Sequence, residues 1–243
     1  MNILAIDTAG PYLSAAIAKD DKIIARYKSK SEKSHSDMLA PSVGKLLKKT
    51  RLKPKDIDLY AISIGPGSFT GLRIGVAFIK GMNLFTEKPV VCVPTLDAMA
   101  ALIDDNVVCP VVDAKRQNVY TAIYKKVKSK KEKGKSLKRI TKYSVIPINE
   151  ILEEIKCRGT ACRAPTVVFT GDGIDVYKEE IIKVLGKKAI FADKKYWHTE
   201  ADNIAKIGFR MYNKNQGVVR NLSALSPMYL YPRDIQCVRR QQR

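Results

Sequence analysis

The sequence predicts an α/β protein built from two similar lobes. Three observations carry this prediction: short apolar-rich segments separated by turn residues, longer segments with helical spacing, and the return of the same order of elements in the second half of the chain. Each copy follows the order β-β-β-α-β-α-β-α over roughly 105 residues, about the length of one domain. We therefore expect a first lobe at residues 1–105 and a second at residues 106–243.

The first copy begins with three short strands. Apolar-rich segments at residues 2–7, 12–18 and 22–27 are separated by Gly-Pro and Asp-Asp turns. Ser36 or Asp37 is the expected N-cap of the helix that follows. The rest of this copy is expected in the order helix ending near Lys49, strand 59–64, helix 69–85, strand 89–93 and helix 95–103.

The second copy repeats this order with a longer and more polar start. Its elements are expected as strands at 107–113, 118–126 and 137–146, a helix at 150–156 capped by Asn149, a strand at 166–170, a helix at 175–185, a strand at 188–192 and a helix at 200–212. The chain beyond Gly217 is expected to be polar or irregular. Its end, from Arg233 onward, is expected to be disordered.

The chain is strongly basic, with 44 Lys and Arg against 24 Asp and Glu, and most of the excess lies in its second half. Residues 1–110 carry a net charge of +4, whereas residues 111–243 carry +16. Residues 125–142 hold ten basic side chains and one Glu. Such a field attracts polyanions, so we expect weak RNA affinity, with a solvated basic loop as the alternative. Few aromatic residues accompany the charges, so base stacking is not predicted.

The composition indicates a cytoplasmic protein without a membrane span or a metal site. The apolar runs are far shorter than the ~20 residues of a span, and a signal peptide is not predicted. Five scattered Cys fit a reducing compartment. Only His35 and His198 are present, and paired Cys-x-x-Cys spacing is absent. His35-Ser36-Asp37 is not a catalytic triad, because adjacent side chains diverge.

A glycine-rich string joins the end of a predicted strand to the start of a predicted helix. It has the sequence GPGSFTGLRIG at residues 65–75. It is not a P-loop, and Thr70 stands where Gly-x-Gly-x-x-Gly needs its third glycine. A tight turn with a capped helix is the favoured interpretation. Anion binding at the helix N-terminus is the alternative.

Acidic residues and turns recur at equivalent strand ends of the two copies. Asp7 and Thr8 end the first strand, Asp113 ends its counterpart, and Gly171-Asp172-Gly173 occupies the position of Gly65-Pro66-Gly67. Ligands bind at such strand ends in open α/β sheets. These turns therefore allow a nucleotide cleft between the lobes, where an acidic residue orients a metal-bound phosphate. From the residues alone, capping of a local turn is the favoured interpretation of the Asp that ends the first strand.

Four strings together resemble one known family. They are ILAIDT at residues 3–8, HSDMLAP at 35–41, the string at 65–75 and VDAKRQNVY at 112–120. They are similar to the TsaB (YeaZ) family, a bacterial subunit of the machinery that makes threonylcarbamoyladenosine in tRNA. The resemblance is specific over residues 1–125 and weaker beyond them. The signature loop that it assigns comprises Gly65, Pro66, Gly67, Ser68, Phe69, Thr70, Gly71 and Arg73.

The resemblance implies a fold, a set of partners and a function. The implied fold consists of two ribonuclease-H-like lobes, as in actin/Hsp70-like ATPases. The implied partners are the catalytic subunit TsaD and the ATPase TsaE. TsaD transfers threonylcarbamoyl from threonylcarbamoyl-adenylate to the adenosine just 3′ of the anticodon in ANN-reading tRNAs. We expect this chain to bind and activate that transferase, with tRNA held by the complex.

The same resemblance indicates that this chain is not the catalyst. TsaD-like chains hold a metal with a His-x-Glu-Gly-His segment, and the matching stretch here is VPTLDAMA at residues 93–100. Both His are missing, and Thr95 and Met99 are poor ligands for such a metal. We therefore expect no catalytic residue, no metal and no required cofactor, with weak ATP or ADP binding left open.

The resembled family pairs through two helices of its first lobe. We expect a TsaD-like subunit to dock there, and a second copy to dock there when the chain is alone. The expected interface comprises His35, Leu39, Val43, Leu46, Leu72, Val76 and Ile79. The alternative is that these side chains face the sheet.

Three rival functions stay open at this stage. The first is a nucleotide-binding small-molecule kinase or ATPase of the same fold, with Asp7, Asp113 and Gly171-Asp172-Gly173 at the nucleotide. The second is a metallopeptidase, which the missing His pair disfavours. The third is a generic RNA-binding module.

Overall fold

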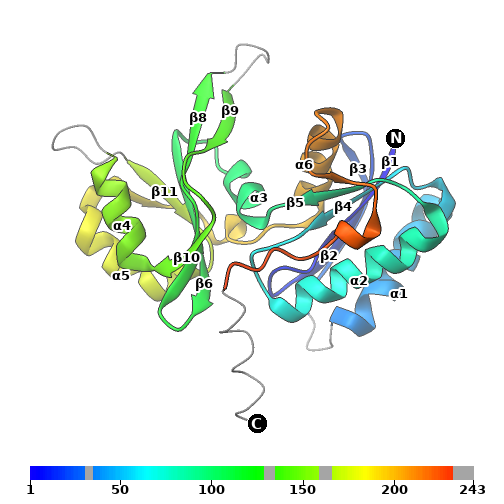
Figure 1. Cartoon of the computed structure of the whole chain (residues 1–243), viewed down its shortest axis with the longest axis horizontal. Helices are drawn as coiled ribbons and strands as arrows, with labels where there is room; N and C mark the ends of the chain where they lie inside the picture. Colours follow the sequence, from blue (N-terminus) through cyan, green and yellow to red (C-terminus); the bar gives the residue numbers. More distant parts are fainter. Residues whose placement is uncertain (31–34, 129–134, 159–165, 232–243) are drawn as a thin grey trace, which may run out of the picture. The chain divides into compact units, whose positions relative to one another are not determined.

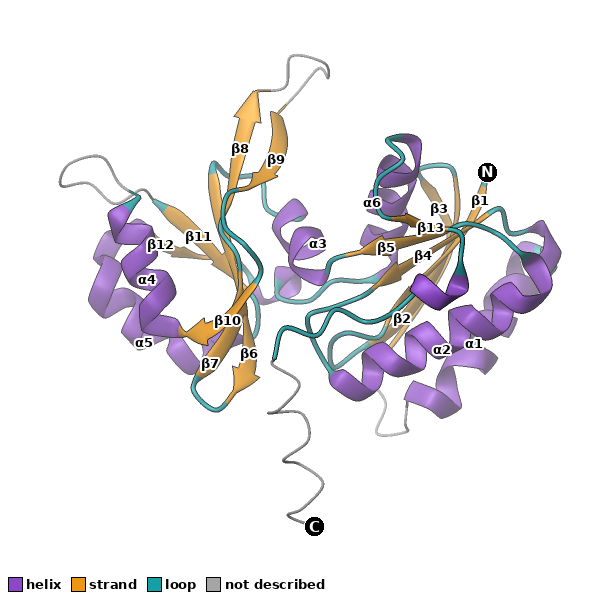
Figure 2. Ribbon diagram, viewed as in Figure 1, coloured by secondary structure: helices purple, strands orange, loops and turns teal. Residues whose placement is uncertain are grey.

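The computed structural model describes residues 1–30, 35–128, 135–158 and 166–231 (Figure 1). The chain divides into two units. The first consists of Met1–Ala98 and Thr199–Met228, and the second of Met99–His198 and Tyr229–Arg243. Each unit contains one β-sheet with helices packed against it (Figure 2). No helix in the described ranges is long and apolar enough to cross a membrane.

The first unit is built on a six-stranded sheet in the order β13-β5-β4-β1-β2-β3. The first three strands form an antiparallel meander, whereas β4 and β5 run parallel to β1. Every residue of β4 and nearly every residue of β1 is buried, as expected for central strands covered on both faces. The strands are β1 (Asn2–Asp7), β2 (Leu13–Lys19), β3 (Lys22–Ser29), β4 (Leu59–Ser63), β5 (Val90–Val93) and β13 (Val218–Val219).

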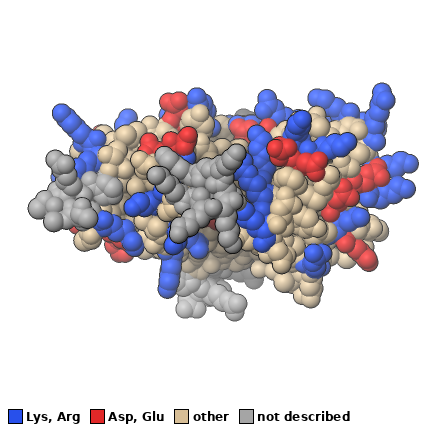
Figure 3. Space-filling model, turned by 90° about the horizontal axis from the view of Figure 1, so that it is seen from above, with Lys and Arg blue, Asp and Glu red and all other residues tan. Residues whose placement is uncertain are grey.

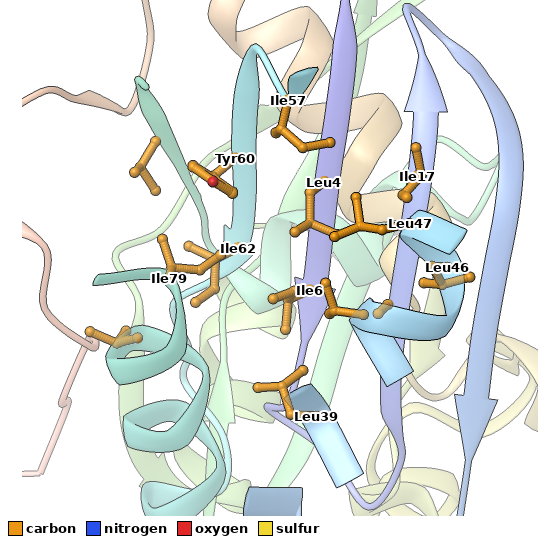
Figure 4. Close-up of a cluster of buried hydrophobic side chains, with 14 of the residues drawn as sticks. Leu4, Ile6, Ile17, Leu39, Leu46, Leu47, Ile57, Tyr60, Ile62 and Ile79 are labelled. Carbon is orange, nitrogen blue, oxygen red and sulfur yellow. The ribbon is translucent and has the colours of Figure 1, made fainter. Parts of the chain in front are cut away.

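Helices cover both faces of this sheet. On one face, α1 (His35–Thr50) and α2 (Phe69–Thr86) bury apolar side chains at helical spacing against β1 and β4 (Figure 4). On the other face, α6 (Ala201–Asn213) packs against Ile3 and Ala5. The approach of α6 is close, because a Cβ on Gly208 would lie 2.6 Å from the Cβ of Ala61.

The second unit repeats the five-strand arrangement. Its sheet has the order β10-β7-β6-β11-β12, with two antiparallel pairs followed by two parallel ones, as in β3-β2-β1-β4-β5. Helices α4 (Ile148–Cys157) and α5 (Gly173–Leu185) bury Leu152 and Ile181 in its core. The predicted α/β class with two similar lobes is confirmed. The strands are β6 (Val107–Lys115), β7 (Asn118–Thr121), β10 (Ser144–Pro147), β11 (Val167–Thr170) and β12 (Ala189–Phe191).

The start of the second copy differs from the prediction. The single strand predicted at 118–126 is two strands, since β7 ends at Thr121 and β8 (Tyr124–Lys128) leaves it to pair with the beginning of β6. The predicted third strand at 137–146 is also divided. Its first part belongs to β9 (Lys135–Arg139), the partner of β8, and only β10 joins the main sheet. Alternation along one strand does not show which neighbour the strand pairs with, so the inserted hairpin was not predicted.

The predicted domain boundary also differs from the structure. The helix predicted at 200–212 exists as α6, but it covers the sheet of the first unit rather than the second. The segment beyond Gly217 is not wholly irregular, because β13 pairs with β5 and Leu225 is fully buried in the first unit. Periodicity predicts the apolar face of a helix, but not the sheet that this face covers.

Helix starts were predicted less well than helix positions. Ser36 and Asp37 lie inside α1, which includes His35, and Asn149 lies inside α4, which begins at Ile148. The short helix α3 (Thr95–Ala101) ends two residues earlier than predicted. The part of the basic stretch at residues 129–134 and the chain end from Arg233 onward lie outside the described residues.

Candidate functional site

The glycines of the string at residues 65–75 pack α2 directly against the end of β1. A Cβ on Gly71 would lie 2.0 Å from the carbonyl oxygen of Thr8, and one on Gly67 would lie 2.4 Å from that of Ala9. A Cβ on Gly75 would lie 2.5 Å from Oγ1 of Thr8. Each position excludes any larger residue, so these three glycines permit close packing of helix and strand.

The turn before α2 is held by backbone hydrogen bonds and a helix cap. The Ser68 amide donates to the Ala9 carbonyl at 2.7 Å, and the Ser68 hydroxyl accepts from the Gly71 amide at 3.2 Å. Gly65 has a φ of +105°, and its carbonyl accepts from the Thr95 amide at 2.8 Å. The favoured sequence interpretation, a tight turn with a capped helix, is confirmed.

Three other residues of the string lie on the outer surface of α2. Phe69, Thr70 and Arg73 are exposed, and the Arg73 guanidinium lies 3.8 Å from the centre of the Phe69 ring. Neither Thr70 nor this stacked pair takes part in the packing of α2 on the sheet. The string therefore has a buried part that builds the fold and an exposed part that can contact another molecule.

Asp7 is a buried structural carboxylate, with 2% of its surface exposed. Its Oδ1 accepts from the Ala9 amide at 2.9 Å and from the Ser63 hydroxyl at 2.5 Å, and its Oδ2 accepts from the Thr199 hydroxyl. The carboxylate thus joins the ends of β1 and β4 to the segment before α6. These contacts agree with the alternative that Asp7 serves local backbone and side-chain groups.

The second unit brings its predicted residues together in a similar way. The Asp113 amide donates to Oδ1 of Asp172 at 3.0 Å. Gly171 has a φ of +115°, and a Cβ there would lie 2.2 Å from the carbonyl oxygen of Val111. A Cβ on Gly173 would lie 2.8 Å from the same oxygen. The turn at 171–173 therefore packs on β6 as the turn at 65–67 packs beside β1.

The Asp113 side chain is occupied by a neighbour. It accepts from the Lys115 amide at 2.8 Å and forms an ion pair with the Lys115 ammonium at 2.5 Å. The hydrogen bond to Asp113 raises the pKa of the exposed Lys115. Tyr231, which sequence reasoning did not single out, donates to the Ala114 carbonyl at 2.9 Å. Nucleotide binding by these residues and by Asp7 and Thr8 stays a prediction.

Six of the seven residues predicted for the partner interface lie in the core of the first unit, and docking through these two helices stays a prediction. Leu39, Val43, Leu46, Leu72, Val76 and Ile79 are at most 6% exposed and belong to the core of the first unit. Only His35 is partly exposed. Their apolar spacing reports packing against the sheet, which is the alternative stated for them.

A different part of α2 is both apolar and exposed. Leu84 is 69% exposed and Phe85 is 89% exposed, at the C-terminal end of the helix. Ala77 and Gly81 are exposed on the preceding turns, and a Cβ on Gly81 would meet no atom within 4 Å. A helical projection of the sequence separates these positions, because they lie opposite the buried stripe.

Groups that could act as nucleophiles or metal ligands are buried or dispersed. Burial raises the pKa of Cys92 to about 11 and that of Cys109 to about 12, so both are thiols near neutral pH. Thr95 and Met99, one turn apart on α3, are buried. In the described ranges no three His, Cys, Asp or Glu side chains are grouped to hold a metal ion.

Comparison with known proteins identifies relatives over most of the chain. A model of the family described as "TsaD: tRNA N6-adenosine threonylcarbamoyltransferase" matches residues 14–235. The Bacillus subtilis protein named "tRNA threonylcarbamoyladenosine biosynthesis protein TsaB" is 30% identical over 210 residues, which cover 86% of this chain and 87% of that protein. The Escherichia coli protein of the same name is 35% identical over 130 residues, 52% of this chain and 56% of that protein.

A solved structure has the same fold. The structure of YeaZ from Pseudomonas aeruginosa superposes with a TM-score of 0.72 and 21% sequence identity, covering 94% of this chain and 99% of that one. Similarity therefore extends over both units. The chain belongs to the TsaB (YeaZ) family, whose relatives in Bacillus subtilis and Escherichia coli are named tRNA threonylcarbamoyladenosine biosynthesis proteins.

Proposed function

We propose that this chain is a non-catalytic subunit that binds and activates a TsaD-like transferase during threonylcarbamoyladenosine formation in tRNA. The names of its relatives support the pathway. The target would be the adenosine just 3′ of the anticodon in ANN-reading tRNAs, and a TsaE-like ATPase would join the complex.

The main support for a docking role is the exposed apolar C-terminal end of α2. Leu84 and Phe85 leave most of their surfaces in water, although burying side chains of this size is favourable by about 1.5–3 kcal/mol each. Large apolar side chains exposed side by side are typical of protein–protein contact sites. A partner that covers them would recover this free energy.

The rest of the outer surface of α2 suits a helical partner. Ala77 and Gly81 have little or no side chain, so another helix can approach the backbone closely along this line. At the start of the helix, the Arg73 guanidinium stacked on Phe69 offers a charged edge to the same surface. We name the set Phe69, Arg73, Ala77, Gly81, Leu84 and Phe85 the α2 outer face.

The same face would serve both the heterodimer and a homodimer of the isolated chain. Two copies that meet through one face form a symmetric interface, and a TsaD-like subunit would then compete with the second copy.

The chemistry of the buried groups supports a binding role. Burial raises the pKa of the Cys92 and Cys109 thiols, so neither is an activated nucleophile. Protein donors engage the Asp7 carboxylate.

Isothermal titration calorimetry with the TsaD-like subunit tests this proposal. We expect Leu84→Glu and Phe85→Glu to weaken binding by about 30-fold or more each, because a charge at a buried interface position costs about 2 kcal/mol or more. Val176→Glu on α5 is the matched control, since Val176 is 59% exposed in the other unit. Wild-type affinity in both α2 variants, with unchanged melting temperatures, would refute the docking site.

A further inference from the structure

We propose that Lys125 of β8 and Lys138 of β9, on the exposed face of the second unit's β8–β9 ribbon, form an RNA-binding arm that contacts the phosphate backbone of tRNA. The β8–β9 hairpin is inserted in the chain between β7 and β10, two neighbouring strands of the second sheet. The inference rests on the proposed function in one respect, namely that tRNA is the polyanion that this subunit meets.

The base of the hairpin is fixed to the second unit. Strand β8 pairs with β6 through Val107 and Val108, and the Lys126 amide donates to the Asn106 carbonyl at 2.8 Å. On the β9 side, the Ile140 amide donates to the Ile123 carbonyl at 2.8 Å. The two strands then continue beyond the main sheet (Figures 1 and 2). Because both strands are fixed at the base, the side chains of the ribbon alternate between two defined faces.

The two faces of the ribbon have different environments. Tyr124 is 1% exposed, and Lys126, two residues on and therefore on the same face, forms an ion pair with Asp104. The opposite face carries Lys125 of β8 and Lys138 of β9, and both are exposed. Tyr124 and Lys126 are thus directed to the protein, whereas Lys125 and Lys138 are directed to water.

The register places like charges directly across the ribbon. Lys125 of β8 lies opposite Lys138 of β9. Like charges at directly opposed positions destabilise a β-ribbon. An acidic residue across from a lysine would stabilise the ribbon instead. A bound phosphate between the two strands would offset the repulsion, which is why the arrangement favours a polyanion as ligand.

The aromatic residues of the arm indicate what kind of contact it makes. Tyr124 is buried, and the Arg139 guanidinium lies 3.6 Å from the centre of the Tyr143 ring. The first ring is thus covered by protein and the second already stacks on a guanidinium, so stacking on unpaired bases is not expected. Lys and Arg side chains are spread over the face shown in Figure 3. The contact expected is therefore to the phosphate backbone, without sequence preference.

The salt dependence of tRNA binding tests the arm. Affinity is measured for the complex of this chain with its TsaD-like subunit, between 50 and 200 mM salt. Each phosphate contact adds about 0.7–0.9 to the slope of log affinity against log salt. Lys125→Ala/Lys138→Ala should therefore lower the slope by about 1.4–1.8. Lys183→Ala/Lys187→Ala removes the same charge from exposed positions near the end of α5 and should leave the slope unchanged.

A second variant separates binding from hairpin stability. Lys138→Glu sets an acidic residue opposite Lys125, so the melting temperature should stay the same or rise while tRNA binding weakens. Unchanged tRNA binding in this variant would overturn the proposal. An equal loss in the control double variant would also overturn it, because net charge alone would then explain the effect.

Two further outcomes distinguish this proposal from lipid binding and from a failure of the proposed function. If the hairpin variant loses affinity for phosphatidylserine vesicles but not for tRNA, the arm binds lipid and the proposal is wrong. If the wild-type chain does not bind the TsaD-like subunit, the proposed function fails instead. The same tRNA titration on the isolated chain then still decides whether the hairpin lysines bind RNA.

Discussion

At the scale of single residues, the Asp7 carboxylate joins three segments of the first unit that are far apart in the sequence. It accepts hydrogen bonds from Ala9, Ser63 and Thr199, and it is almost fully buried. The partners at Ser63 and Thr199 could not be foreseen, because 56 and 192 residues separate them from Asp7. The sequence indicated only an acidic residue at the end of a strand. Such a residue fits both a ligand site and a structural role.

Removing this carboxylate should destabilise the fold. We expect Asp7→Ala to lower the free energy of unfolding by about 3 kcal/mol or more, because several buried donors lose their acceptor together. Urea denaturation followed by circular dichroism measures the loss. Asp21→Ala, at an exposed turn, is the control and should change it by less than about 0.5 kcal/mol. A variant at position 7 as stable as the wild type would show that the carboxylate is not structural.

At the scale of elements, two glycines of α2 should respond in opposite directions to the same substitution. Gly71→Ala places a Cβ 2.0 Å from the Thr8 carbonyl oxygen and should cost about 2 kcal/mol or more, since α2 must move off β1. Gly81→Ala meets open space and should stabilise the chain by about 0.5–1 kcal/mol. Thermal unfolding of both variants checks this. Equal effects would contradict the packing assigned to the glycine string.

The elements also show which features of a sequence predict structure. The helix at 69–85 and the strands at 2–7 and 59–64 were predicted almost to the residue, because each has a clear period and definite turn residues at its ends. The hairpin of β8 and β9 was missed, since pairing partners are decided by contacts that lie outside the strand. The exposed α2 residues that we propose for docking were not predicted, for a related reason. An apolar stripe reports burial, whereas a docking surface consists of the exposed positions between the stripes.

At the scale of the whole molecule, the first unit is assembled from both ends of the chain. Helix α6 supplies Ala201, Ile204 and Ala205 to the core beside β1, although residues 99–198 of the second unit separate it in sequence from the rest of that core. The sequence repeat could predict two lobes. It could not predict that the last helix of the second copy would cover the sheet of the first, because either sheet offers an apolar face.

A fragment made to the predicted boundary should therefore fail to fold. Residues 1–105 lack α6 and β13, so the face containing Ile3, Ala5 and Ala61 would be exposed to water. We expect this fragment to give a non-cooperative thermal transition and to aggregate. Residues 1–98 joined to 199–228 by a flexible Gly-Ser linker should unfold cooperatively. If the shorter fragment folds as well as the linked one, α6 is not part of the first unit's core.

The central claim is that this chain assists a transferase and is not itself the catalyst. Reconstitution tests it most directly: the TsaD-like subunit, the TsaE-like ATPase, unmodified ANN-reading tRNA and threonylcarbamoyl-adenylate are combined with and without this chain, and modified adenosine is measured by mass spectrometry. The account predicts modification only when this chain is present, none from this chain alone, and a marked loss with Phe85→Glu. Equal modification with and without the chain, or modification by the chain alone, would contradict it.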